Sequence, residues 1–329
     1  VEWRVSINSN PHLMMVGLPG MGKTTALINI CRQLAEAGVA PIVFSFHDDI
    51  DEKLTQVLGP LHTTDFAGLG FNPLRVDGAG PTAYVDVAGT LRDIFASIFP
   101  DLGDIQLEEM RQAIKQSYDD KGWAIARDGG ERPGPPAFRA FFDILRSKQK
   151  PNANLLARLQ ELADYGFFDA AADRASLLAE PRPTLVRVHT TTNNILQNAF
   201  SSFVLYSLYK DMFRRGVQSR LTHAIIFDEA HRAAKLKLIP QFAKECRKYG
   251  VALALASQGA KDFSPTLYEA VGSYLALRVT DADARALARN AASTADQTRI
   301  TDRMKGLEPY TAMFFSMAAG RPNFVRLSG

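Results

Sequence analysis

The sequence has few of the features that mark secreted or membrane proteins. Its 329 residues include only two cysteines, Cys31 and Cys246, and a secreted disulfide framework would need more. No run of apolar residues approaches the roughly 18 that a membrane-spanning helix requires. The N-terminus lacks the basic and then apolar segments of a secretory leader. We therefore expect a cytoplasmic protein without direct membrane insertion, whose two thiols lie in the core or on helix surfaces.

The net charge is also small. The formal charge of +3 at pH 7 is weak support for a nucleic-acid partner, because a phosphate-binding surface usually makes a domain more basic. Residues 210–248 are more uneven, with ten lysines and arginines against four acidic residues. These basic residues either contact DNA or form solvated helix faces. Because the chain starts at Val1 and enters a strand-like segment almost at once, we expect a domain of a longer protein.

One stretch near the N-terminus carries a phosphate-binding signature. Residues 16–25 read V-G-L-P-G-M-G-K-T-T, which fits the Walker A spacing G-x-x-x-x-G-K-[ST]. In that motif the backbone N–H groups of a glycine-rich loop bind phosphates at the start of a helix. The flanks agree, because residues 12–16 form a short apolar run and the apolar residues after Thr25 recur at helical spacing. The predicted nucleotide-binding residues are Gly17, Pro19, Gly20, Met21, Gly22, Lys23, Thr24 and Thr25.

A second motif follows an apolar strand about 200 residues later. Residues 224–229 read A-I-I-F-D-E, the Walker B pattern of a strand that ends in acidic residues. Asp228 is predicted to hold Mg²⁺ together with the Thr24 hydroxyl, and Glu229 to orient and deprotonate water. The strands of a parallel sheet end at one edge, so both motifs should converge there. His231 either couples this site to DNA or begins the next helix.

A third element is the apolar strand at 251–257, which ends in Gln258. A polar amide at that position could sense the γ-phosphate or the attacking water, or it could be a surface residue in a turn. The predicted second strand, 41–46, is followed by the acidic segment 47–51. That segment could approach the nucleotide or metal, or form a solvated turn.

The order of the segments predicts an α/β fold with a mainly parallel sheet and a helical insertion. Strand-like and helical segments alternate in 1–89 and 181–329, which we assign to the core. Residues 90–180 have helical periodicity and form the predicted insertion. Within it, the glycine- and proline-rich segment 122–136 predicts a loop.

Together these motifs resemble the HerA/FtsK superfamily of DNA-pumping ATPases, particularly its HerA-like and type IV secretion branch. The resemblance spans nearly the whole chain and is carried by G-L-P-G-M-G-K-T, F-N-P-L, I-I-F-D-E-A-H, E-C-R-K-Y-G-V-A-L-A-L-A-S-Q and Y-L-A-L-R-V-T-D. It implies a RecA-like P-loop NTPase core that works as a homo-hexameric ring around DNA, bound mainly without sequence preference. More narrowly, N-P-H-L-M-M-V-G-L-P-G-M-G-K-T-T and F-S-F-H-D-D-I-D-E look like the ATPase subunit of the DNA phosphorothioation-dependent restriction system. That resemblance implies further restriction or nuclease subunits as partners.

The same resemblance assigns an arginine to the neighbouring subunit's nucleotide. In relatives it lies in the pattern L-R-x-T-D after the sensor strand, and here it is Arg278. DNA pumps of the FtsK type carry their arginine where this chain has Tyr274. The role of Arg278 therefore rests on the HerA-like branch alone, and Arg247 and Arg289 are rivals.

The expected activity is phosphoryl transfer from ATP to water with Mg²⁺. Lys23 bridges the β- and γ-phosphates, Glu229 acts on water, Gln258 reports the γ-phosphate and Arg278 acts in trans. One alternative is a nucleotide-gated assembly module with little hydrolysis, which would need neither Glu229 nor Gln258. Another is a type IV secretion-like motor that moves protein or a protein–DNA conjugate across a membrane.

Overall fold

The computed structural model describes residues 3, 5–65, 69–126, 131–169, 175–230 and 238–327. Contacts within the chain group it into two compact units. Unit 1 comprises residues 1–64, 177–189 and 215–329, and unit 2 comprises residues 65–176 and 190–214. All residues of the predicted nucleotide site belong to unit 1.

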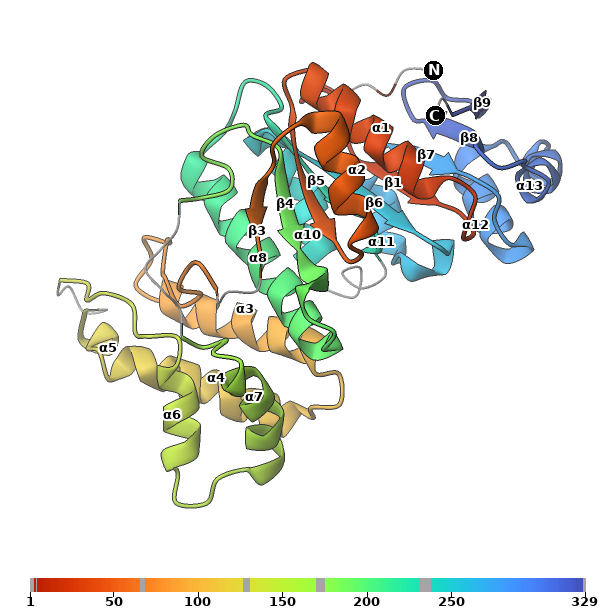
Figure 1. Ribbon diagram of the computed structural model, residues 1–329. Coiled ribbons are helices and arrows are strands. Elements are labelled where there is room, and N and C mark those ends of the chain that lie inside the picture. Colours follow the sequence, from red (N-terminus) through yellow and green to blue (C-terminus); the bar gives the residue numbers. More distant parts are fainter. Residues whose placement is uncertain are drawn as a thin grey trace. The chain divides into compact units, whose positions relative to one another are not determined.

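Unit 1 is built on a nine-stranded sheet with the order β3-β4-β2-β5-β6-β1-β7-β8-β9 (Figure 1). The strands are β1 (Leu13–Val16), β2 (Ala40–Ser45), β3 (His62–Thr64), β4 (Thr184–Arg187), β5 (His223–Phe227), β6 (Val251–Ser257), β7 (Ser273–Ala276), β8 (Thr311–Ser316) and β9 (Asn323–Arg326). Neighbours from β3 to β7 pair in parallel, whereas β7, β8 and β9 pair antiparallel. The predicted α/β fold with a mainly parallel sheet is confirmed.

Continuous apolar sequence explains the central strands. Every residue of β2, β5 and β6 is buried, which is typical of parallel strands that are covered on both faces. Helices α1 (Lys23–Glu36) and α2 (Asp49–Leu58) cover one of these faces (Figure 1). Leu27, Cys31 and Leu54 from the two helices join alternate strand residues in one hydrophobic core.

The other helices of unit 1 follow β5. They are α10 (Leu238–Glu245), η2 (Cys246–Tyr249), η3 (Ala260–Asp262), α11 (Pro265–Ala270), α12 (Asp281–Ala291) and α13 (Gln297–Lys305). Cys31 on α1 and Cys246 on η2 are free and fully buried, and burial raises the pKa of both thiols. Of the two placements predicted for these thiols, core or helix surface, the structure shows the core for both.

Unit 2 is helical. It contains α3 (Ala83–Ile98), α4 (Asp104–Asp119), α5 (Trp123–Ala126), α6 (Ala140–Ser147), α7 (Ala153–Asp164) and nearly all of α8 (Asn194–Arg215), and the short helix η1 (Val188–Thr190) precedes α8. Aromatic rings form its core, with Phe95, Phe141 and Phe168 in mutual contact at centroid distances from 5.2 to 6.5 Å. In the described part of 90–180, the predicted helical segments are present.

Two details differ from the sequence-based expectations. The acidic segment after β2 begins a helix, α2, because Ile50 and Leu54 give it a buried side. The predicted loop 122–136 contains α5, and Trp123 is buried beside Tyr84 with its indole N–H donated to the Gly134 carbonyl. Residues 127–130 lie outside the described part of the chain. Contacts also group 65–89 and 190–214 with unit 2, so the predicted domain boundaries stay a prediction.

None of the helices in the described ranges combines the length and the apolar character needed to cross a membrane.

Candidate nucleotide-binding site

The glycine-rich loop joins β1 to α1 and is anchored to both strands that flank β1. The Gly17 N–H donates to the Ser257 carbonyl at the end of β6 (3.2 Å), and the Leu18 N–H donates to the Arg278 carbonyl beyond β7 (2.8 Å). These bonds fix the loop at the carboxyl edge of the parallel strands. That edge is where ligands bind in open α/β sheets.

Two positions of the loop require glycine for different reasons. At Gly17, an added Cβ would lie 2.8 Å from the Cβ of Leu277. Gly22 has φ of 101°, and its added Cβ would lie 2.8 Å from the ring of Tyr310. The motif glycines therefore allow close approach of the backbone to neighbouring segments.

Lys23 is the first residue of α1 and lies across the loop. Its ammonium donates to the carbonyls of Gly17 (2.6 Å) and Leu18 (3.3 Å). Partial burial lowers the pKa of Lys23, and the negative charges of Glu229 and Asp228 oppose that shift. The first turn of α1 has no acidic residue, so the helix start is free of a competing anion. Lys23 therefore presents a positive charge at the start of a helix, where the first backbone N–H groups have no partner within the helix.

Asp228 and Glu229 follow directly after β5. Asp228 is only 6% exposed, and burial, with the neighbouring Glu229 charge, raises its pKa to about 6. The charges of His47 and Lys23 act in the opposite direction. A carboxylate oxygen of Glu229 lies 3.8 Å from Nε2 of His47. The two motifs thus meet at one edge of the sheet, with two carboxyl groups near one ammonium.

This set of groups fits a phosphate chain and a divalent cation. Lys23 and the backbone N–H groups are donors for phosphate oxygens, whereas the buried Asp228 carboxyl and the Thr24 hydroxyl are hard oxygen ligands of the kind that Mg²⁺ takes. Within the described ranges, no group of three or more histidine, cysteine, aspartate or glutamate side chains could hold a metal by itself. Asp228 and Thr24 would supply oxygen ligands to a cation at this site, beside phosphate oxygens of the ligand.

Gln258 is exposed and follows β6 directly. Its loop is fixed from two sides, because the Ala260 N–H donates to the Asp283 carboxylate (2.8 Å) and the Gly259 N–H donates to Asp262 (3.2 Å). The preceding residue, Ser257, is the one that binds Gly17. Gln258 therefore lies at the predicted edge of the sheet, and its sensing role stays a prediction.

Arg278 has its main chain at the P-loop of its own chain. Its Nε donates to the Leu307 carbonyl (2.6 Å), and a terminal nitrogen lies 4.0 Å from a Glu308 carboxylate oxygen. The rivals Arg247 and Arg289 are exposed on η2 and α12. A role in trans stays a prediction for all three.

Two other residues named in the sequence analysis have different outcomes. Tyr274 is buried in β7, where its hydroxyl donates to the Tyr268 carbonyl. His231 lies outside the described residues.

The sequence analysis missed Tyr310 near this edge, whereas His47 and Asp51 belong to the segment 47–51, which it placed either near the nucleotide or metal or in a solvated turn. His47 follows β2, the strand next to β5, so the neighbouring strand order could have indicated its approach to Glu229. Asp51 accepts hydrogen bonds from Ser45 and Arg187 and lies 3.0 Å from Nε2 of His189, which makes it a structural link. Tyr310 contacts the loop from the segment before β8, and no local motif indicates that contact.

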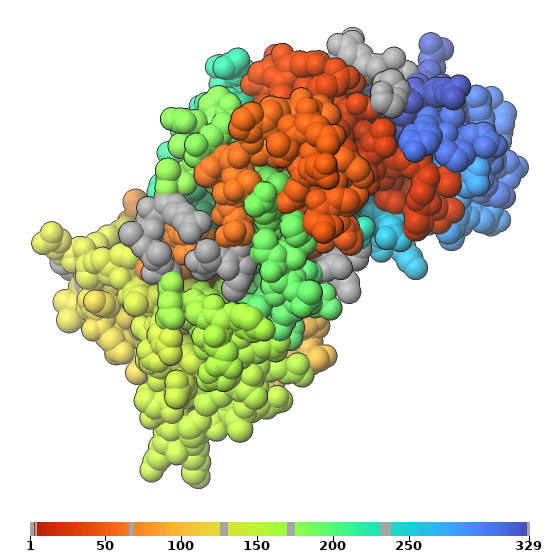
Figure 2. All heavy atoms as spheres, in the orientation of Figure 1, coloured from red at the N-terminus to blue at the C-terminus, as the bar shows by residue number. Residues whose placement is uncertain are grey.

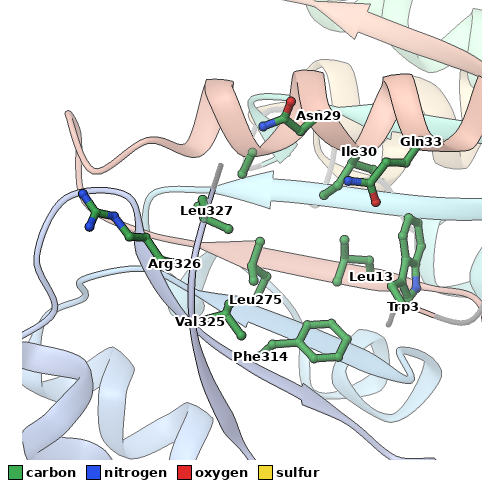
Figure 3. Close-up of a pocket in the computed structure, with 11 residues that line it drawn as sticks. Trp3, Leu13, Asn29, Ile30, Gln33, Leu275, Phe314, Val325, Arg326 and Leu327 are labelled. Atoms are coloured by element: carbon green, nitrogen blue, oxygen red, sulfur yellow. The ribbon is translucent and has the colours of Figure 1, made fainter. Parts of the chain in front are cut away.

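A separate pocket of about 270 Å³ lies between α1 and the strands β1, β7, β8 and β9 (Figure 3). Its lining is largely apolar: Trp3, Leu13, Ala26, Asn29, Ile30, Gln33, Leu275, Phe314, Val325, Arg326 and Leu327. It contains none of the residues predicted to bind nucleotide. The pocket shares helix α1 with the P-loop, and Arg326 lies at the end of the pocket nearest the start of α1.

Searches of protein-family models and of curated proteins found no match. Solved structures do match. VirB4 of Thermoanaerobacter pseudethanolicus has 18% identity and a TM-score of 0.70, over 98% of this chain and 90% of VirB4. The plasmid coupling protein TrwB in complex with ADP and Mg²⁺ has 13% identity and a TM-score of 0.64, over 96% of this chain and 85% of TrwB. TrwB with a non-hydrolysable ATP analogue has 14% identity and a TM-score of 0.64, over 97% of this chain and 86% of TrwB.

At these identities the likeness establishes the fold. Together with the loop between β1 and α1, it defines the class: the chain has the α/β fold of the P-loop NTPases. Within that class, its fold resembles VirB4 and TrwB along nearly its whole length.

Proposed function

We propose that the chain is a motor ATPase of the HerA type, which hydrolyses ATP to translocate on or remodel DNA. One observation carries the proposal: the buried Asp228 carboxyl and the partly buried Glu229 carboxyl, which follow β5, act electrostatically on Lys23 at the start of α1. Phosphoryl transfer to water requires this combination of phosphate donors, a metal ligand and a group that orients water. The fold likeness to TrwB, whose solved complexes contain ADP with Mg²⁺ and an ATP analogue, supports ATP and Mg²⁺ as ligands.

Each predicted residue then has a definite task. The backbone N–H groups of the loop and Lys23 bind the phosphates, and Thr24 and Asp228 hold Mg²⁺. When bound, Mg²⁺ neutralises charge that develops on the phosphate oxygens. Glu229 orients the attacking water and accepts its proton, and Nε2 of His47 lies 3.8 Å from its carboxylate. Gln258, at the end of β6, reports the presence of the γ-phosphate.

Assembly belongs to the same proposal. A homo-hexameric ring would bring Arg278 of one subunit to the nucleotide of the next, so that hydrolysis would depend on assembly. The proposed ring binds DNA mainly through phosphate contacts, without sequence preference. The core would consist of 1–89 and 181–329, with 90–180 as an insertion. Other restriction or nuclease subunits would be partners if the chain acts in a phosphorothioation-dependent restriction system.

A second candidate is a type IV secretion-like motor. The fold likeness to VirB4 and to the conjugative coupling protein TrwB favours it at least as well as a restriction role. The two candidates share the ATPase site and differ in what the motor moves. Bare duplex DNA should stimulate a restriction-type motor, whereas a secretion-type motor should respond to its transported protein or protein–DNA conjugate.

The proposed ATPase activity is tested by Glu229→Gln. This change removes the proton acceptor but keeps the phosphate-binding groups, so ATP binding should persist while turnover falls by about 100-fold or more. The measurement is phosphate release against protein concentration, with and without duplex DNA, beside ATP binding by calorimetry.

Glu36→Gln is the matched control, because Glu36 lies exposed on α1 and pairs only locally with Arg32. Equal turnover by wild type and Glu229→Gln would contradict the catalytic role of Glu229. Tight ATP binding with negligible hydrolysis under every condition, including wild type with DNA, would favour the assembly module instead.

A further inference from the structure

We propose that Tyr310 and Arg326 form the site for the nucleoside end of the nucleotide, with the base stacked on the Tyr310 ring. This inference rests on the proposed function, because it presumes phosphates on the loop before α1. It concerns the part of the ligand that the Walker motifs do not contact.

The direction of the bound nucleotide follows from the order of the strands. β1 lies between β6 and β7, and Asp228 and Glu229 follow β5 on the β6 side. The γ-phosphate must face Glu229 for water to be positioned there. The nucleoside must therefore leave the loop toward the other side of β1, where β7, β8 and β9 lie.

Tyr310 is fixed against the loop on that side. Its N–H donates to the Met21 carbonyl (3.1 Å), and its carbonyl accepts from the Leu327 N–H (2.8 Å). The ring lies against Gly22, where an added Cβ would be 2.8 Å from Cδ1 and 3.1 Å from Cε1. The phosphate loop and the aromatic ring are thus held together by main-chain bonds.

The conformation of Tyr310 is costly. In the described part of the chain, it is the one non-glycine residue with positive φ, at 61°. A large side chain in this left-handed region costs about 1 kcal/mol or more. Despite that cost, the residue remains 46% exposed, so burial does not offset it. An aromatic face that is held open beside a phosphate loop suits a flat, apolar ligand group.

Arg326 supplies a polar group next to this face. It is exposed at the end of β9, one residue before the Leu327 that binds Tyr310. Figure 3 shows Arg326 at the end of the pocket nearest the start of α1, turned away from the apolar lining. Figure 2 shows the red N-terminal and blue C-terminal surfaces of unit 1 meeting on one face. A guanidinium here can donate to the ribose or a phosphate, or stack on the base.

The chemistry of this site predicts a broad preference for bases. A tyrosine face stacks on any base because every base has a π-face, and stacking does not read the edges. The ligand class is therefore a nucleoside triphosphate without strict base preference, with ATP and GTP bound at similar affinity.

The test compares ATP with inorganic tripolyphosphate, both with Mg²⁺, by calorimetry on the whole chain. Tyr310→Ala should weaken ATP binding roughly tenfold and leave tripolyphosphate binding unchanged, since it removes only base stacking. Tyr310→Phe should bind ATP like wild type. Fluorescence of 2-aminopurine riboside triphosphate should be quenched on wild type and Tyr310→Phe but not on Tyr310→Ala.

Matched controls separate the possible failures. Tyr165→Ala removes another exposed ring, from unit 2, and should change nothing. Arg326→Gln should weaken ATP binding, whereas Arg321→Gln in the preceding turn should not. Unchanged ATP affinity of Tyr310→Ala, or an equal loss for tripolyphosphate, would overturn the inference while leaving the proposed function intact. Absence of binding of both ligands to wild type would overturn the proposed function itself.

Discussion

The candidate site places one carboxyl group, that of Asp228, where water is largely excluded. Asp228 shows the consequence, because burial and the Glu229 charge raise its pKa to about 6. Between pH 4 and 6 the folded protein therefore keeps a proton that the unfolded chain loses. Stability conferred by that proton is present at low pH and is lost as the pH rises through 6. At neutral pH the ionised Asp228 lowers the free energy of unfolding.

Asp228→Asn should therefore stabilise the protein without ligand. At pH 7.5 we expect the free energy of unfolding to rise by about 1–3 kcal/mol, and the gain to shrink toward pH 4.5. Urea unfolding of wild type and variant at both pH values measures it. Asp143→Asn, exposed on α6, is the control. A variant less stable than wild type at pH 7.5 would show that Asp228 is held by compensating contacts.

Single residues also show what the sequence could not reveal. Lys23, Asp228 and Glu229 were predictable because each belongs to a short motif with a known chemical task. Tyr310 was not, since its contact with Gly22 depends on how the strand pair β8–β9 returns to the loop. His47 came near Glu229 only through the neighbouring positions of β2 and β5. Contacts between distant segments carry no local pattern.

At the scale of elements, two buried histidines stabilise the starts of strands. His12 precedes β1 and accepts a hydrogen bond from the Leu253 N–H of β6 (3.1 Å). His223 begins β5, with Nε2 lying 3.2 Å from the Glu180 carbonyl. Burial lowers the pKa of each imidazole to about 4. Both histidines are therefore neutral in the folded protein under conditions where the unfolded chain binds a proton.

These histidines should make stability fall in mild acid. The folded pKa values lie below the ordinary 6.5, so stability present above pH 6.5 is lost as the pH falls toward 4. Between pH 7.5 and 5.0, His12→Gln and His223→Gln should each lose about 2 kcal/mol less than wild type, although each starts less stable. Urea unfolding at the two pH values tests this. Equal losses for variant and wild type would mean that the histidines titrate normally.

Helices and strands were predictable wherever their buried apolar residues recur in the sequence as a continuous run or at helical spacing. The predicted strands at 12–16 and 251–257 match β1 and β6 within one residue, and the helix predicted from Thr25 matches α1. Helix α2 was missed because only Ile50 and Leu54 face the core among its ten residues. The antiparallel strands β8 and β9 were also not predicted. The sequence before them shows no clear strand or helix period. β8 pairs with β7 and β9 pairs with β8, so these strands are defined by contacts between distant segments.

For the whole molecule, the proposed ring makes Arg278 the decisive residue. If Arg278 acts in trans, Arg278→Ala should bind ATP but hydrolyse it on the order of 10³-fold more slowly. Mixing it with Glu229→Gln should restore some activity, because some interfaces then combine an intact Glu229 with an intact neighbouring Arg278. Phosphate release from mixed rings, with both variants confirmed by mass measurement, is the assay. Arg285→Ala, exposed on α12, is the control.

An inactive mixture would indicate that Arg278 acts in its own chain, in keeping with its hydrogen bond to Leu307. Full activity of Arg278→Ala alone would remove it from the site. Arg247 or Arg289 would then be the next candidates for the residue that acts in trans.

The central claim is that the loop before α1 binds the phosphates of ATP. Calorimetric titration of ATP with Mg²⁺ into wild type, Lys23→Ala and Lys53→Ala tests it most directly. Lys53 is an exposed lysine on α2 that pairs with Asp49, so its removal should leave binding unchanged. Lys23→Ala should lose about 100-fold or more in affinity, because a charged donor to the phosphates is removed. Equal affinity of Lys23→Ala and wild type would contradict the account.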